Sequence, residues 1–142
     1  MSGAESTAAA LSFLWLGMVL AISFLEAPLK FRAPGVTLQI GLGIGRLVFQ
    51  ALNAIEAVLA VAILGVLVAR PPAAGAVAVL IVAAVVLVLQ LVTVRPRLTR
   101  RSNAVLAGEG GPRSRAHLAY AGLEVIKAFA LVIGGVVLFA SS

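Results

Sequence analysis

Four long apolar runs, separated by short polar segments rich in arginine and proline, dominate the chain. Each run is close to or above the roughly 20 residues that a helix needs to cross a bilayer. Their nearly unbroken hydrophobicity is typical of helices that face lipid. The pattern therefore predicts four membrane spans, at about residues 8–27, 46–69, 73–94 and 116–139.

The first two runs need further interpretation. The first is expected to end at Pro28, and we interpret it as an uncleaved span because Glu5, with no Lys or Arg, precedes it. Residues 36–69 are helix-compatible throughout, which is too long for one upright span at about 1.5 Å per residue. We expect an interfacial or tilted, glycine-rich lead-in at about residues 37–45, followed by the span.

That lead-in contains Gly41, Gly43 and Gly45, a spacing that superficially resembles a phosphate-binding loop. The preceding β-strand and the third-glycine spacing of such a loop are missing. Small residues also let membrane helices approach closely. The glycines therefore predict close helix packing.

Polar residues interrupt the fourth run in steps of four, three, four and three: Arg113, His117, Tyr120, Glu124 and Lys127. This spacing keeps their side chains on one face of an α-helix. The other runs carry polar residues toward the same side of the membrane: Arg46, Gln50, Asn53 and Glu56 in the second, Ser23, Glu26 and Lys30 in the first, and Gln90, Thr93 and Arg97 in the third.

Two charges are expected near the bilayer centre. Glu56 follows Arg46 by ten residues and Lys127 follows Ala116 by eleven, which puts each about 15 Å into the membrane. A lone charge there costs at least about 3 kcal/mol, so we expect Glu56 and Lys127 to pair. Glu124 could then turn to His117, to Arg46 or to the polar end of the third run.

Two interpretations of this polar network remain open. It can be a structural device that fixes helix register, or an ion, proton or ligand site in a cavity open to the cytoplasm. His117 is expected to be a network partner rather than a haem or metal ligand. Trp15 and Tyr120 are expected to be packing or interfacial-belt residues. The candidate network comprises Glu56, Lys127, Glu124, His117, Tyr120, Asn53, Arg46 and Glu26.

The composition excludes several kinds of site and one class of partner. The 142 residues predict a single domain and include no cysteine and one histidine, which excludes disulfides, thiolate sites and multi-histidine metal centres within the chain. Only 11% of the residues are charged, and the mean hydropathy is +1.15. The net charge of +6 comes from basic residues that bracket apolar runs without interleaved aromatics, so nucleic acid is not an expected partner.

The basic residues also predict orientation. Nine lie in the two segments on one side of the expected membrane, and only Arg70 lies opposite. The positive-inside rule makes the nine cytoplasmic and puts both ends of the chain outside. Besides Arg46, those expected to set topology and contact lipid headgroups are Lys30, Arg32, Arg95, Arg97, Arg100, Arg101, Arg113 and Arg115.

Several short motifs occur in an order that resembles a known family. They are Trp15-x-Gly17-Met18, Phe24 through Pro28-Leu29-x-Phe31-Arg32, a glycine-rich start to a Leu47-x-Phe49 helix, Arg95-Pro96-Arg97, and a His117-bearing last run. The chain is similar to the small four-helix membrane family of unknown function that includes the cisplatin-resistance-associated transmembrane proteins and distant copper-resistance membrane proteins.

This resemblance implies the architecture and draws attention to Arg32 and His117, without implying a reaction. The eukaryotic members are longer between spans three and four. The chain has no cysteine to hold a soft metal, so platinum or copper handling is not expected.

Together these features predict an all-α, antiparallel four-helix bundle in the cell membrane. We expect a non-enzymatic accessory or structural subunit or small binding protein, without cofactor or metal. Its expected partners are the bilayer and other membrane subunits or further copies of the chain. The alternative is a minimal oligomeric transporter or channel for protons or small solutes. No nucleophile motif or cofactor signature supports an enzyme.

Overall fold

The computed structural model describes residues 3–69, 74–94, 100 and 115–140, and these residues contain helices but no strand. Four helices are long and apolar enough to cross a membrane, at Gly3–Lys30, Leu38–Ala69, Gly75–Val92 and Tyr120–Ala140. The predicted all-helical class and the four candidate spans are therefore confirmed at this level.

The first span consists of three consecutive helical segments: α1 (Gly3–Val19), the π-helix η1 (Leu20–Glu26) and α2 (Ala27–Lys30). The expected end at Pro28 is wrong, because the helix continues to Lys30 with Pro28 in the first turn of α2. Proline lacks an N–H and its ring crowds the carbonyl one turn earlier. The wider π turns immediately before it, where Ala27 N–H bonds the carbonyl of Ile22, accommodate the proline without ending the helix.

The second span is one continuous helix, α3 (Leu38–Ala69). No break occurs at the glycines, so the expected lead-in and the expected span, about residues 46–69, belong to one helix from Leu38 on. Gly41 and Gly45 are buried. A Cβ on Gly41 would overlap the Phe31 ring, and one on Gly45 would come within 2.7 Å of Lys30 Nζ. The glycines allow the end of the first span to pack closely against α3.

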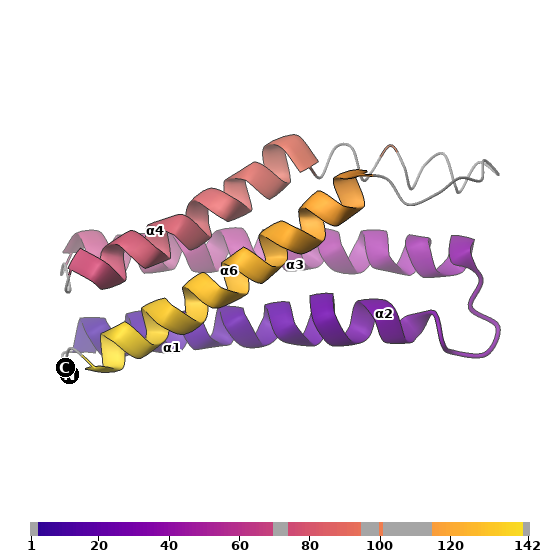
Figure 1. Ribbon diagram of the computed structural model, residues 1–142. Helices are drawn as coiled ribbons and strands as arrows, with labels where there is room; N and C mark the ends of the chain where they lie inside the picture. The colour runs from indigo at the N-terminus through magenta and orange to yellow at the C-terminus, as the bar shows by residue number, and fades with distance from the viewer. Residues whose placement is uncertain (1–2, 70–73, 95–99, 101–114, 141–142) are drawn as a thin grey trace.

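The third span comprises α4 (Ala74–Leu89) and a second π-helix, η2 (Gln90–Val94), and the fourth is α6 (Arg115–Ala140). Figure 1 shows α6 crossing in front of α1 and α3, with the start of α1 and the end of α6 at the same end of the molecule. Helix α6 makes its most extensive contacts with α4 and α1.

The core draws apolar side chains from every span, among them Trp15, Ile63, Leu80 and Leu131. Many large apolar side chains instead point outward, including Leu47, Val61, Val68, Val92 and Phe129. Such a surface would be costly in water and is the surface expected of helices in lipid.

Candidate functional site

A group of polar side chains lies inside the otherwise apolar helices, and we call it the buried network. Its charged members are almost inaccessible: Glu56 and Lys127 are 0% exposed and Glu124 is 1% exposed. Its members come from all four spans: Trp15 and Ser23 from the first, Asn53 and Glu56 from α3, Gln90 from η2, and Tyr120, Glu124 and Lys127 from α6.

Lys127 is the centre of the network. Its Nζ forms ion pairs with Glu56 Oε2 and with Glu124 Oε1, the latter at 2.5 Å. It also donates a 2.8 Å hydrogen bond to Gln90 Oε1. An ammonium group has three donors, so these three acceptors from α3, α6 and η2 use all of them.

Glu124 is held on both carboxylate oxygens. Besides Lys127, Oε1 accepts a 2.8 Å hydrogen bond from Gln90 Nε2. Oε2 accepts a 2.5 Å hydrogen bond from Ser23 Oγ. Both oxygens of this carboxyl group therefore have hydrogen-bond partners within the network.

Glu56 is held on one side only. Its Oε2 accepts a 2.7 Å hydrogen bond from the indole Nε1 of Trp15 and pairs with Lys127. Its Oε1 is buried and has no hydrogen-bond partner among the described residues. The two glutamates therefore differ sharply in how their oxygens are satisfied.

Neutral groups extend the network between α3 and α6. Tyr120 OH donates a 3.3 Å hydrogen bond to Asn53 Oδ1, and the Tyr120 ring meets the Phe49 ring edge-to-face at 5.7 Å between centroids. Gln90 Nε2 also lies 3.5 Å from the backbone carbonyl oxygen of Tyr120. Because Gln90 bonds Glu124, Lys127 and this carbonyl, its amide ties η2 to α6 at several points.

Both π-helices carry a network residue. Ser23 lies within η1, and Gln90 is the first residue of η2. A π turn adds a residue to the helical repeat and so changes which side chains face inward, and such segments often occur at functional sites. Here Ser23 and Gln90 both donate hydrogen bonds to Glu124.

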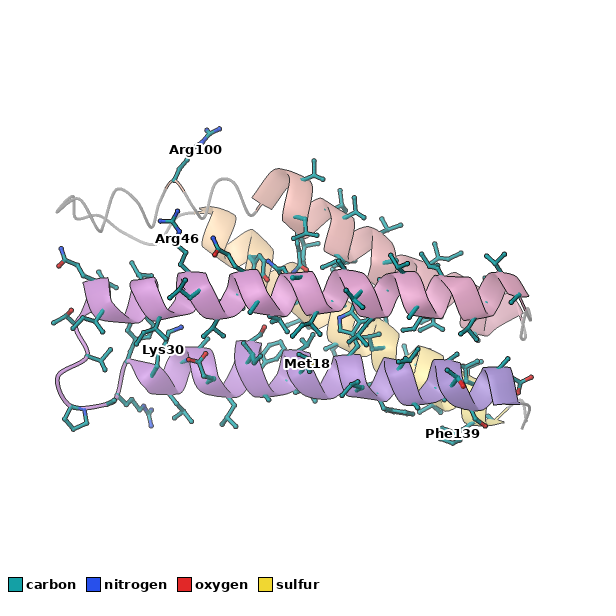
Figure 2. All side chains as sticks on the ribbon, turned by 180° about the vertical axis from the view of Figure 1, so that it is seen from behind. Met18, Lys30, Arg46, Arg100 and Phe139 are labelled. Carbon is teal, nitrogen blue, oxygen red and sulfur yellow. The ribbon has the colours of Figure 1, made fainter. Side chains whose placement is uncertain are left out.

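Five of the candidate residues lie together: Glu56, Lys127, Glu124, Tyr120 and Asn53. Glu124 reaches the polar end of the third run, one of the three alternatives considered. Glu26 is paired with Lys30 on its own helix instead, at 3.9 Å. Arg46 is half-buried and in Figure 2 projects from the side of α3 that faces away from Lys30. His117 belongs to the first turn of α6, and its side chain lies outside the described part of the chain.

The basic residues are described only in part. Lys30 Nζ lies 5.5 Å from the ring centroid of Phe31 and 5.8 Å from that of Phe49. The lysine side chain therefore reaches from the end of α2 to α3. Arg32 and Arg100 are exposed, and Figure 2 shows Arg100 near the same end of the molecule as Arg46. The other expected headgroup contacts lie outside the described residues or have side chains outside them: Arg95, Arg97, Arg101, Arg113 and Arg115.

Trp15, Ser23 and Gln90 were missing from the predicted network. Trp15 was expected to be a packing or belt residue, and packing is confirmed because it is 1% exposed and part of the apolar core. Its hydrogen bond to Glu56 was not expected. Helix rise could have found it: Trp15 precedes Glu26 by eleven residues, about 16 Å, which is the depth assigned to Glu56. Ser23 and Gln90 were recognised as polar interruptions of their spans, and the polar end that contains Gln90 was one expected partner of Glu124. The hydrogen bond from Ser23 to Glu124 was not expected.

Within the described residues, no group of three or more His, Cys, Asp or Glu side chains could hold a metal ion. No family model, curated protein or solved structure matches the chain. The buried network and the helices that carry it are therefore the basis for a functional proposal.

Proposed function

We propose that the chain is a non-enzymatic, multi-pass protein of the cell membrane, an antiparallel four-helix bundle that acts as a structural or accessory subunit or small binding protein. The single observation that supports this is the buried network itself. Each span contributes at least one side chain, and nearly every polar group is satisfied by another member. A network filled by its own side chains holds helices in register.

The surface supports a role in assembly. Outward-facing apolar side chains on each span can contact either lipid or the apolar helices of a partner subunit, while the buried network keeps the presenting face rigid. No charged group of the network reaches that surface, since Glu56, Lys127 and Glu124 are at most 1% exposed.

Purification at native abundance tests the proposal. The chain, carrying a small affinity tag, is extracted in a mild detergent and its co-purifying chains are identified and quantified. We expect a membrane partner or further copies of the chain in fixed stoichiometry. A matched preparation in which Val61 on the exposed face is changed to Lys should lose that partner if α3 presents the interface. A stable lone monomer at native abundance would contradict the accessory role.

A further inference from the structure

The charges of the buried network do not balance. Two carboxyl groups, Glu56 and Glu124, face one ammonium group, Lys127. With both carboxylates ionised, the network would carry one net negative charge inside the apolar part of the molecule. A single net charge there is expensive, and proteins usually neutralise such a charge rather than bury it.

Among the described residues, the other side chains bonded to the network bring no positive charge. Trp15 and Ser23 from the first span, Asn53 from α3, Gln90 from η2 and Tyr120 from α6 are all neutral. Lys30 pairs with Glu26. A metal cation such as sodium or calcium would need several oxygen ligands, whereas the described network leaves only Glu56 Oε1 without a partner.

We propose that the buried network is an intramembrane proton-binding site, in which Glu56 Oε1 carries one exchangeable proton. The asymmetry of the two glutamates identifies the atom. Both oxygens of Glu124 accept hydrogen bonds, so a proton on Oε2 would require the Ser23 hydroxyl to turn and accept instead. Glu56 has donors on Oε2 and none on Oε1. Protonation converts the Glu56 carboxylate to a carboxylic acid and brings the network to zero net charge.

This inference goes beyond the structural role and rests on the proposed location of the helices in a bilayer. It adds a ligand, the proton, and a site whose charge state responds to it. Such a site is also what the alternative function, a minimal proton-coupled transporter, would require.

Infrared spectroscopy of the protein in lipid nanodiscs tests the inference through the C=O stretch of protonated carboxyl groups, which ionised carboxylates lack. At neutral pH we expect one buried protonated carboxyl per chain, shifted in D₂O because its proton exchanges. Glu56→Gln should abolish the band. Lys127→Met should about double it, because both remaining carboxyls must then be neutral. Glu26→Gln, which changes the paired glutamate near the end of the same bundle, should leave it intact.

The outcomes separate cleanly. Absence of the band in the unaltered protein at neutral pH would overturn the inference, as would a band that survives Glu56→Gln. A band that disappears when choline in the buffer is replaced by sodium would show a metal cation at the site, and would also overturn it. If Lys127→Met does not fold, Glu124→Gln is measured in its place. The Glu56 carboxylate then balances the charge of Lys127 without a proton, so the band should be lost.

The proposed function is tested by a different measurement, the purification at native abundance. A lone monomer that shows the expected band would remove the accessory role and leave the proton site. A stoichiometric complex without the band would do the reverse.

Discussion

At the scale of single residues, the network depends on complete use of donors and acceptors. Lys127 donates to three acceptors, and Gln90 both donates and accepts, bridging Lys127 and Glu124. A buried ion pair with such partners is tolerated, but removing one member leaves an uncompensated charge. The stability of the protein should therefore respond to charge balance more than to the number of ionic contacts.

Lys127→Met should lower the free energy of unfolding by about 3 kcal/mol or more at neutral pH, because the buried Glu124 carboxylate loses its cation and must either stay unpaired or take up a proton. Adding Glu124→Gln should recover part of the loss. Glutamine at this position can still accept from Gln90 and donate to Ser23 Oγ. Unfolding by denaturant or heat in one detergent measures all variants.

Glu26→Gln is the matched control for that rescue. Its carboxylate pairs with Lys30 and is partly exposed, so adding it to Lys127→Met should recover nothing. Equal recovery by Glu26→Gln and Glu124→Gln would mean that the loss does not come from unbalanced charge in the network.

At the scale of helices, close packing depends on small residues at particular crossings. Gly134 and Gly135 of α6 are buried. A Cβ on Gly134 would lie 2.7 Å from Leu80 Cδ2 of α4, and one on Gly135 would lie 2.6 Å from the Phe13 ring of α1. These two glycines therefore allow α6 to approach both of its main neighbours.

Gly134→Ala should lower the free energy of unfolding by about 1–3 kcal/mol, the usual cost of overpacking a core. Leu80 is 2% exposed, so its side chain must repack against its neighbours to make room. Gly122→Ala on the same helix is the control, because its Cβ would meet nothing within 4 Å. It should be neutral or slightly stabilising, since alanine favours helix more than glycine does. Equal effects of the two changes would contradict the close crossing of α4 and α6.

Prediction from the sequence succeeded where a single periodicity or length sufficed. Apolar run length identified four candidate spans, and helix rise placed Glu56 and Lys127 at matching depth, where the structure brings them into contact. It failed at Pro28, because local rules treat proline as a helix end and cannot anticipate the π turns that absorb it.

The network partners that were missed share a physical cause. Ser23 and Gln90 continue the buried faces of their helices at regular spacing, four residues after Val19 and three after Leu87. Spacing within one helix does not show which side chain of another helix they meet. Glu26 and Arg46 were included because of their spacing along their helices. Spacing does not reveal that Glu26 already has Lys30 one turn away.

At the scale of the whole molecule, charge is separated from the apolar surface in two ways. The ionised groups between the helices are buried, while the basic residues outside them are concentrated in two segments of the sequence, around Lys30–Arg46 and Arg95–Arg115. Such an asymmetry sets the orientation of a multi-pass protein during insertion, because positively charged loops are retained on the cytoplasmic side.

We therefore expect a reporter active only outside the cytoplasm, such as alkaline phosphatase, to be inactive when inserted between Arg101 and Arg113 and active when fused after Ser142. A cytoplasm-dependent fluorescent reporter should give the opposite pattern. Replacing Arg95, Arg97, Arg100 and Arg101 by glutamine should produce a mixed orientation, because the basic excess that retains this segment falls. Arg70→Gln, which removes the one basic residue expected outside, should leave the pattern unchanged. Retention of one orientation in the four-arginine variant would mean that the first two spans fix it before the third is inserted.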